Sequence, residues 1–430
     1  MNYQGKNALV AGMQSSGVSA SNLLKSLGAN VTVMDDKLSP ITPAELEAIL
    51  PKTDIVVISP AIPNTHPLVS LSTRLNVPII SEMELGISEL SAEKIMITGT
   101  NGKTTTVQMV EKLLTIMGKK AMAMGNIGYP VSQVVLDKTP LDYAVIEASS
   151  FQLEYIKSTH AKIAVLLNLS PDHMDRYASF RDYVAAKEQI FTNLTAKDYA
   201  VLNYDCKIIR AIGDRLRCKV IWVSTKSEVG DIFVKDNYYY FMKQPMMNVR
   251  ESAVRGEHNR FNFMTAMYVG LILGAKKEHL MALVREYSLS PHRIEYVCSI
   301  GGKSYFNDSK GTNIGATVTA VKALEGKVGL ILGGSDKNEE YFELFEAIDG
   351  LVECVAVTGS NADKIVGAAR KVGFMRIKVC DTLKTALEYV SSDVNVENVL
   401  FSPASASFDR YKNYAERGEV FKQLVYATKI

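Results

Sequence analysis

The 430-residue chain has few cysteines, no long apolar run and little net charge. Its five cysteines are scattered and form no Cys-x-x-Cys pair, which argues against a zinc ribbon or a disulfide framework and fits a reducing cytoplasm. A formal net charge of +2 without a long Lys/Arg run argues against a nucleic-acid binder. No apolar stretch approaches the roughly 18 residues that would cross a bilayer, and the start MNYQGKNALVAGMQ lacks the apolar core of a signal peptide. We therefore expect a cytoplasmic enzyme with no nucleic-acid or membrane partner.

Strand and helix patterns alternate along the chain, which predicts an α/β protein. We expect three domains, namely a Rossmann-like N-terminal domain, a central P-loop ATPase-type domain and a C-terminal Rossmann-like domain, spanning 1–91, 92–289 and 290–430. In the first we expect a helix over 18–28 and strands at 7–12, 29–35, 54–62 and 77–85. In the second, DIFVKDNYYYFMK predicts an antiparallel pair around Asp236-Asn237. The third repeats strand, turn and helix, with strands in KSYFNDS, KVGLILGGS, CVAVTGS, RIKVCD and NVLFSPAS.

The first strand-to-helix turn reads GMQSSG. It keeps the outer glycines of a dinucleotide fingerprint but has Gln14 at the middle position, where a diphosphate needs a bare backbone. This weakens an NAD interpretation and favours a modified nucleotide-sugar site or a plain structural turn.

A glycine-rich turn, GTNGKTT, joins the apolar strand KIMIT to a helix. The helix carries one apolar face, formed by Val107, Val110, Leu114 and Met117. Such a turn offers amide N–H groups and a helix dipole to phosphate oxygens, with Lys103 neutralising the outer phosphates and the Thr104 hydroxyl on magnesium. The usual phosphate loop has about four residues between its first Gly and Gly-Lys, whereas only Thr100 and Asn101 separate Gly99 from Gly102. The spacing therefore raises the question of which kind of phosphate loop this is.

Polar residues follow two further apolar strands of the central part. Glu147 ends the strand in YAVIEASSFQLE, where a carboxylate beside the phosphate loop can hold Mg²⁺; an ordinary exposed glutamate next to a helix cap is the alternative. His173 lies with Asp172 and Asp175 in the loop after AVLLNL, where a histidine has either a metal or acid/base role or a structural one.

Lys187 lies on the apolar face of a predicted helix in SFRDYVAAKEQIF. The pattern alone favours a lysine that snorkels to the edge of that face. The alternative is a buried neutral amine, because burial disfavours the ammonium, and such an amine can react with CO₂ to give a carbamate. A carbamate is an anionic oxygen ligand for Mg²⁺.

In the last domain, polar residues again stand at strand ends, where open parallel sheets bind ligands. They are Asp308, Lys310, Thr312, Lys337, Ser407 and Tyr414. Two lysines and two hydroxyl groups suit a small dicarboxylate or amino acid, and simple turn chemistry is the alternative.

These stretches together resemble the Mur ligase family, in particular its branch that adds D-glutamate in peptidoglycan precursor synthesis. The resemblance covers the whole chain and rests on TGTNGKTT, EASSFQLE, NLSPDHMDRY, AAKEQIF, HNRFN, PHRIE, NDSKGTN, LGGSDKN and SPASASFDRYKNYAERG. The short phosphate loop is the one this family shares with folylpolyglutamate synthetases. The resemblance implies an ATP-dependent ligase that joins D-glutamate to UDP-N-acetylmuramoyl-L-alanine through an acyl phosphate, with two Mg²⁺ ions, as a monomer.

The resemblance also implies a set of site residues. ATP would contact Gly99, Thr100, Asn101, Gly102, Lys103, Thr104, Thr105, Asn259, Asn262, Arg293 and Asp308. The magnesium ions would be held by Thr104, Glu147, His173 and carbamylated Lys187. The UDP-substrate would contact Ser15, Ser16, Asp35, Asp36, Lys37 and Asn126. D-Glutamate would contact Lys310, Thr312, Lys337, Ser407, Phe408 and Tyr414. The catalytic residues among these would be Lys103, Glu147, His173 and Lys187.

Small departures from the family pattern are expected to affect substrate contacts and not the reaction. Gly311 stands where Ala is common, and we expect this only to loosen a turn. Tyr414 stands where Phe is familiar, and Ser15 replaces an apolar residue. A folylpolyglutamate synthetase is the alternative enzyme, but such synthetases lack the Rossmann-like N-terminal domain and the SPASAS motif. A nucleotide switch is disfavoured because no Asn-Lys-x-Asp motif occurs.

Overall fold

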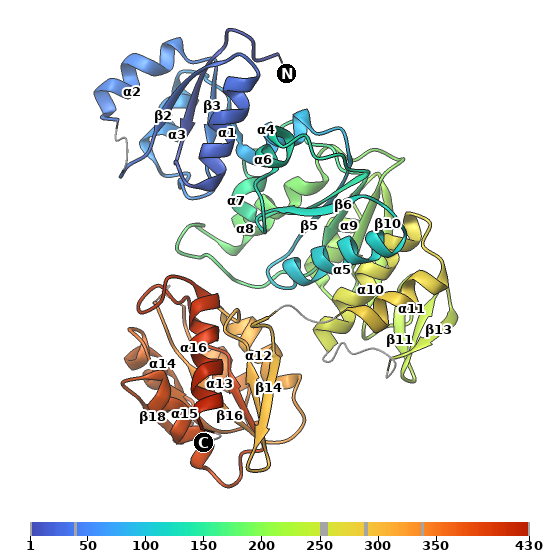
Figure 1. The fold of residues 1–430 in the computed structure, drawn as a ribbon, viewed down its shortest axis with the longest axis vertical. Helices are drawn as coiled ribbons and strands as arrows, with labels where there is room; N and C mark the ends of the chain where they lie inside the picture. Colours follow the sequence, from blue (N-terminus) through green and yellow to red (C-terminus); the bar gives the residue numbers. More distant parts are fainter. Residues whose placement is uncertain (1, 38–40, 250–256, 288–290, 337–338, 429–430) are drawn as a thin grey trace. The chain divides into compact units, whose positions relative to one another are not determined.

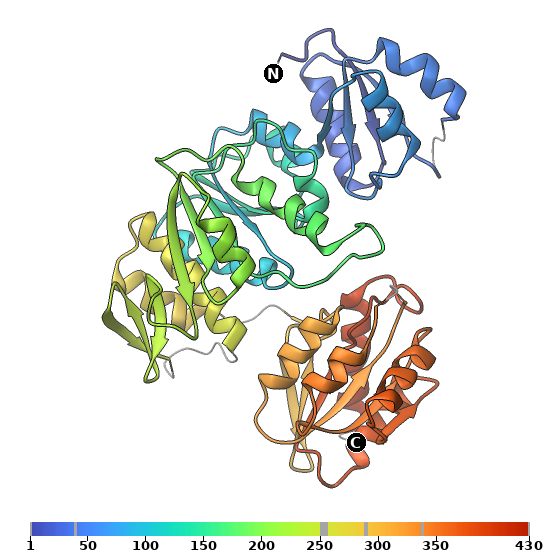
Figure 2. The ribbon, with the colours of Figure 1, turned by 180° about the vertical axis from the view of Figure 1, so that it is seen from behind.

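A computed structural model describes residues 2–37, 41–249, 257–287, 291–336 and 339–428 (Figure 1). The chain forms two compact units. The first comprises Met1–Leu169, Ser179–Glu251 and Phe261–Glu286, and the second comprises Ser170–Ala178, Ser252–Arg260 and Tyr287–Ile430. Two β-sheets belong to the first unit and one to the second (Figure 2). This confirms the predicted α/β class with three sheets, while the domain boundaries at 91 and 289 stay predictions.

The N-terminal sheet is parallel throughout and has the order β2-β1-β3-β4. Its strands are β1 (Asn7–Ala11), β2 (Asn30–Met34), β3 (Ile55–Ile58) and β4 (Ile79–Ser81). Its helices are α1 (Ser15–Ser26), α2 (Pro43–Ile49), η1 (Leu50–Lys52), α3 (Pro67–Arg74) and α4 (Glu82–Glu89). The predicted strand at 77–85 is wrong beyond Ser81, whose hydroxyl accepts a hydrogen bond from Glu84 N at 3.2 Å and so starts α4.

The central sheet has nine strands in the order β13-β12-β11-β10-β9-β8-β5-β7-β6. They are β5 (Glu93–Thr98), β6 (Ala121–Gly125), β7 (Tyr143–Glu147), β8 (Ile163–Leu166), β9 (Tyr199–Asn203), β10 (Lys219–Ser224), β11 (Ile232–Lys235), β12 (Tyr238–Phe241) and β13 (Gln244–Asn248). All pairings are parallel except β11-β12 and β12-β13. The predicted turn at Asp236-Asn237 is confirmed, with both residues at positive φ.

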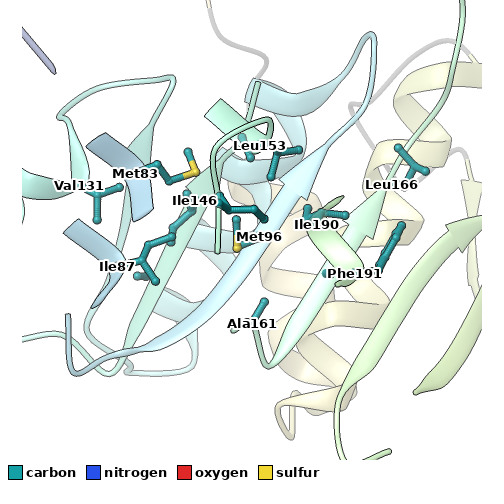
Figure 3. Packing of buried hydrophobic residues seen from close by; sticks show 14 of the residues in the cluster. Met83, Ile87, Met96, Val131, Ile146, Leu153, Ala161, Leu166, Ile190 and Phe191 are labelled. Atoms are coloured by element: carbon teal, nitrogen blue, oxygen red, sulfur yellow. The ribbon is translucent and has the colours of Figure 1, made fainter. Parts of the chain in front are cut away.

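Helices alternate with the strands of this part of the chain, and some of them bury an apolar core against the sheet (Figure 3). They are α5 (Lys103–Ile116), α6 (Val131–Leu136), α7 (Ser150–Leu153), α8 (Phe180–Glu188), η2 (Gln189–Phe191), α9 (Lys207–Gly213), α10 (Glu257–Ile272) and α11 (Lys277–Glu286). Val107, Val110 and Leu114 are buried as predicted from the apolar face of α5. None of the helices in the described residues is long and apolar enough to cross a membrane.

The C-terminal sheet has six strands in the order β14-β15-β19-β16-β17-β18, and only β14 is antiparallel to its neighbour. They are β14 (Glu295–Ile300), β15 (Lys303–Asn307), β16 (Val328–Leu332), β17 (Val352–Val357), β18 (Ile377–Val379) and β19 (Asn398–Phe401). The helices are α12 (Ile314–Lys322), α13 (Phe342–Ala347), α14 (Ala362–Lys371), α15 (Leu383–Ser392) and α16 (Tyr414–Ala427). The sequence analysis missed β14, although Gly301-Gly302 is a strong hairpin signal.

Candidate active site

The phosphate loop joins β5 to α5 and is shaped by two glycines. Gly99 has φ 152° and Gly102 has φ 87°, a conformation that other residues rarely adopt. A Cβ atom on Gly102 would lie 2.6 Å from Asn262 Oδ1, so the loop also needs a bare backbone against α10. No side chain caps the start of α5 at Gly102. A helix start of this kind presents amide N–H groups to an anion.

Two lysines meet at this loop. Lys103 Nζ donates to Gly99 O at 2.9 Å and to Thr100 O at 2.8 Å, and Lys187 Nζ donates to the same Gly99 oxygen at 3.0 Å. Lys187 is 2% exposed, so it does not snorkel to solvent. Its nitrogen lies 4.6 Å from the centre of the Tyr183 ring. Two ammonium groups that share one acceptor oxygen would repel each other.

Glu147 ends β7 beside the phosphate loop. It pairs in register with Ile97 of β5 and is 3% exposed, which excludes the alternative of an ordinary exposed glutamate. Its Oε1 accepts a hydrogen bond from Asn126 Nδ2 at 2.9 Å. Its Oε2 is buried and has no hydrogen-bond partner among the residues that the structure describes. A buried carboxylate oxygen without a partner is costly, and it fits a hard cation such as Mg²⁺.

The metal-binding potential of this region matches magnesium better than zinc. Across the described part of the chain, no three His, Cys, Asp or Glu side chains gather as a complete metal cage. Magnesium is usually held by one or two carboxylates together with substrate phosphates and water. Glu147 and the buried Thr104 hydroxyl at the start of α5 fit that pattern.

The predicted nucleotide residues occupy both compact units. Asn259 and Asn262 are buried on α10. Asp308 follows β15 and accepts hydrogen bonds from Ser402 Oγ at 2.6 Å and from Ile294 N at 3.2 Å. Burial raises the pKa of Asp308 to about 7, against the opposing effects of the Ser402 hydrogen bond and the Arg293 charge.

Gly311 has a larger role than loosening a turn, so our expectation there is wrong. A Cβ atom at this position would lie 2.4 Å from Asp308 Oδ2 and 2.6 Å from Ser402 Oγ. Both are buried, short side chains that hydrogen-bond each other. The glycine therefore makes room for the Asp308–Ser402 contact.

His173 lies in the second compact unit, within residues 170–178. It has φ 58°, and its Nε2 is 3.8 Å from Asp172 Oδ2. That carboxylate accepts a hydrogen bond from Asn313 Nδ2 at 3.2 Å, while Asn313 Oδ1 caps α12. Because Lys187 belongs to the other unit, a shared metal site of His173 and Lys187 stays a prediction.

The predicted D-glutamate residues follow β15 and β19. Lys310 Nζ lies 5.1 Å from the centre of the Tyr414 ring, Ser407 is buried and Phe408 is exposed. Thr312 lies two residues after Lys310 and is half-buried. Lys337 lies outside the described residues.

Sequence reasoning missed two buried residues in this region. His292 is within 2.9 Å of Asn307 Nδ2 through Nδ1, and its carbonyl oxygen accepts a hydrogen bond from Lys310 N at 3.1 Å. Arg417 donates to Ala406 O at 3.0 Å and to Ser309 O at 2.8 Å, and burial lowers its pKa to about 10. The signal for Arg417 was its spacing on one helix face with Phe421 and Val425, which are both buried.

The predicted UDP-substrate residues lie at the carboxyl ends of β1 and β2, with one exception. Ser15 and Ser16 begin α1, and the Asp35 carboxylate accepts hydrogen bonds from Met13 N at 2.7 Å and Lys37 N at 3.0 Å. Asp36 lies 3.5 Å from His66 Nε2. The exception is Asn126, which contacts Glu147 beside the central sheet.

The outer glycines of the GMQSSG turn have a packing reason. Gly12 has φ 86°, and a Cβ atom on Gly17 would lie 1.8 Å from Gly12 O. Glycine at both positions lets α1 pack directly on the end of β1.

Known proteins resemble this chain in sequence and in fold. Residues 97–270 match the Mur ligase middle domain. The MurF ligase from Thermotoga maritima in complex with ADP covers 99% of this chain and 96% of its own, at 16% identity and a TM-score of 0.63. The folylpolyglutamate synthase of Mycobacterium tuberculosis covers 78% of this chain and 92% of its own, at 17% identity and a TM-score of 0.60. These likenesses show the shared fold.

One relative matches nearly the whole length of this chain and so defines its family more closely. The UDP-N-acetylmuramoylalanine–D-glutamate ligase of Koribacter versatilis is 35% identical over 99% of this chain and 98% of its own length. The chain therefore belongs to the Mur ligase family, among its UDP-N-acetylmuramoylalanine–D-glutamate ligases.

Proposed function

We propose that this protein joins the amino group of D-glutamate to the alanyl carboxylate of UDP-N-acetylmuramoyl-L-alanine, with conversion of ATP to ADP and phosphate. The reaction serves peptidoglycan precursor synthesis, and we expect the enzyme to work as a cytoplasmic monomer. The observation that carries this proposal is the phosphate loop beside the unpartnered buried oxygen of Glu147, in a chain with a whole-length relative of that activity. An ordinary structural turn would not need that costly carboxylate.

The phosphate loop would bind the outer phosphates of ATP. The amide N–H groups at 102–105 would face the phosphate oxygens, and Lys103 would exchange its contacts with Gly99 O and Thr100 O for the γ-phosphate. Glu147 and Thr104 would hold a magnesium ion, which would supply positive charge that offsets the charge of the transferring phosphoryl group. Asn259, Asn262, Arg293 and Asp308 complete the nucleotide contacts in this proposal.

The chemistry then takes two steps. An oxygen of the alanyl carboxylate attacks the γ-phosphorus and ADP leaves, which gives an acyl phosphate. The neutral amine of D-glutamate then attacks the acyl carbon and loses a proton. Phosphate leaves, and it carries the carboxylate oxygen that attacked the γ-phosphorus in the first step. Preorganised charges at the phosphate and close placement of the two substrates lower both barriers.

Lys187 would act as a carbamate. Its neutral amine would add to the carbon of CO₂ with loss of one proton, and the new carboxylate-like group, with His173, would hold a second magnesium ion. The burial of Lys187 and its contact with Gly99 O support this role, because they place the amine directly behind the phosphate loop.

The remaining substrate contacts would come mainly from residues that follow strands of the N-terminal and C-terminal sheets. Ser15, Ser16, Asp35, Asp36 and Lys37 would hold the uridine diphosphate, with Asn126 on the sugar-peptide side. Lys310, Thr312, Lys337, Ser407, Phe408 and Tyr414 would hold D-glutamate. The cationic Lys310 above an aromatic ring suits recognition of a carboxylate.

One assay tests the proposed function. Purified protein is incubated with ATP, Mg²⁺, UDP-N-acetylmuramoyl-L-alanine and a panel of D- and L-amino acids, and ADP and the amide product are measured. We expect ADP release only when both the nucleotide-sugar and D-glutamate are present, and none from a Lys103→Ala control. ADP release that needs no nucleotide-sugar, or that follows a folate substrate instead, would overturn the proposal.

A further inference from the structure

Helix α4 contributes to two apolar cores at once. Its Met83 and Ile87 pack in the core of the central sheet, as Val131 of α6 does (Figure 3). Its Leu85 packs in the core of the N-terminal sheet. The two helices lie side by side (Figure 1). A Cβ atom on Gly86 would lie 2.6 Å from Ser132 N, so the backbones approach as closely as a glycine allows.

Glu82, the first residue of α4, caps α6. Its side chain is buried, and its Oε1 accepts a hydrogen bond from Ser132 N at 2.7 Å. Pro130, which precedes α6, provides no side-chain cap of its own. A helix start without a local cap needs an acceptor from elsewhere, and Glu82 is that acceptor.

A short loop connects this cap to the phosphate site. It comprises residues 126–130. At its first residue, Asn126 N donates to Glu147 O and Asn126 Nδ2 donates to Glu147 Oε1, both at 2.9 Å. Gly125 N donates to Tyr129 O at 2.9 Å, which closes the loop on itself. The loop is therefore anchored by a buried glutamate at each end.

We propose that Glu82 is a positioning residue for the ligase reaction. By capping α6 it fixes loop 126–130, and through Asn126 it fixes the direction in which the Glu147 carboxylate points. A shift of α6 would carry Asn126 with it and turn the metal-facing oxygen of Glu147 away from the phosphate loop. This proposal rests on the proposed function, because it assigns Glu147 to magnesium.

The same helix provides a matched control in Glu84. Its carboxylate accepts hydrogen bonds from Ser158 N at 2.7 Å, from Lys157 N at 3.0 Å and from Thr159 N at 3.1 Å. These contacts tie α4 to residues 157–159 and not to loop 126–130. Removing Glu84 therefore loosens the same helix without touching the cap of α6.

The test compares Glu82→Gln, Glu82→Met and Glu82→Ala with Glu84→Leu, each checked for folding by circular dichroism. Loss of a residue that orients a metal ligand weakens metal affinity by roughly 10–100-fold. For Met and Ala at position 82 we expect the half-saturating Mg²⁺ concentration to rise by about tenfold, with a higher KM for the nucleotide-sugar and an unchanged KM for D-glutamate. Glu82→Gln keeps the side-chain shape and a carbonyl acceptor for Ser132 N, so it should retain the wild-type Mg²⁺ requirement and KM values. Glu84→Leu should lower Tm and leave the Mg²⁺ requirement unchanged.

Binding of ADP measured by calorimetry, with and without Mg²⁺, separates this proposal from the proposed function. If the wild-type protein had no ligase activity, the proposed function would be refuted. The Mg²⁺-dependent part of ADP binding would still show whether the Glu147 carboxylate is correctly oriented. Unchanged Mg²⁺ dependence in folded Glu82→Met and Glu82→Ala would overturn the positioning role. So would the same Mg²⁺ defect in Glu84→Leu, or loss of folding in both position-82 variants while Glu84→Leu folds, because Glu82 would then be a general structural residue.

Discussion

Buried and half-buried charged side chains near the carboxyl ends of the central and C-terminal sheets have different hydrogen-bond partners. At the central sheet, Lys103 and Lys187 share the Gly99 carbonyl oxygen, and Glu147 Oε2 has no partner within the described structure. At the C-terminal sheet, Arg417 donates to three backbone carbonyl oxygens and Asp308 accepts from Ser402 and Ile294.

We infer that the charged side chains at the central sheet are positioned to bind a ligand, whereas those at the C-terminal sheet stabilise the structure around the site. A lysine that donates to loop carbonyls can exchange them for phosphate oxygens, whereas an arginine that satisfies three buried carbonyls holds the polypeptide in place. We therefore expect substitutions at the central site to reduce turnover with little loss of stability, and substitutions at Arg417 to reduce stability first.

The largest effect is expected for Lys103→Ala. Loss of this preorganised charge should cost roughly 3–4 kcal/mol of transition-state stabilisation, while Tm and affinity for the nucleotide-sugar stay close to wild type. Turnover, uridine-ligand affinity and Tm are measured separately. Near-normal turnover would remove Lys103 from the phosphate site.

Arg417→Ala should show the opposite pattern. Leaving the carbonyl groups of Ser309, Ser405 and Ala406 without their donor should cost about 3 kcal/mol of unfolding free energy. Urea unfolding measures this loss, and Arg410→Ala is the control, because Arg410 is exposed. Equal stability of the two variants would contradict the supporting role of Arg417.

Lys187→Ala tests the carbamate. Loss of one metal ligand should lower activity by roughly 10–100-fold, and acetate should restore part of it by occupying the vacated ligand position. Lys187→Arg should not be rescued, because its fixed positive charge fills the space. The acetate series is run at constant ionic strength with chloride as the control. Full activity of the Ala variant without any added acid would refute the carbamate.

A pH-dependent effect on stability is expected from the ionisation of Asp308. Its pKa is about 7 in the folded protein and near 4 when unfolded. The folded state therefore binds the extra proton, so the stability that this proton provides is complete below pH 4 and is lost as the pH rises through 7. The slope is at most about 1.4 kcal/mol per pH unit. Asp308→Asn should flatten the wild-type fall in unfolding free energy between pH 4 and 7, and parallel curves for the two proteins would contradict the assignment.

The smallest effect is expected for Gly311→Ala. Its new methyl group meets Asp308 and Ser402, so we expect a loss of about 1–3 kcal/mol. Gly367→Ala is a control within α14, where nothing lies within 4 Å of the added atom, and it should stabilise by up to about 1 kcal/mol. Thermal unfolding compares the two, and a stabilising Gly311→Ala would show that the pocket tolerates the methyl group.

Local patterns predicted much of this fold, because their causes lie within a few residues. The strand–loop–helix of the phosphate site and the Asp236-Asn237 hairpin follow from spacing and turn chemistry. The burial of Lys187 does not, because the helix pattern alone favours a lysine that snorkels to the edge. Contacts between distant segments could not be read in this way. The Gly311 environment depends on Ser402, far along the chain, and the cap of α6 depends on Glu82 in another helix.

The central claim is that the carboxylate of the nucleotide-sugar attacks ATP at the phosphate loop, and an oxygen-isotope experiment tests it most directly. UDP-N-acetylmuramoyl-L-alanine labelled with ¹⁸O in its alanyl carboxylate is converted with ATP and D-glutamate, and the released phosphate is analysed by mass spectrometry. If an acyl phosphate forms, the phosphate released with each amide carries one ¹⁸O atom from that carboxylate. Unlabelled phosphate, formed at the same rate as the amide, would contradict the account.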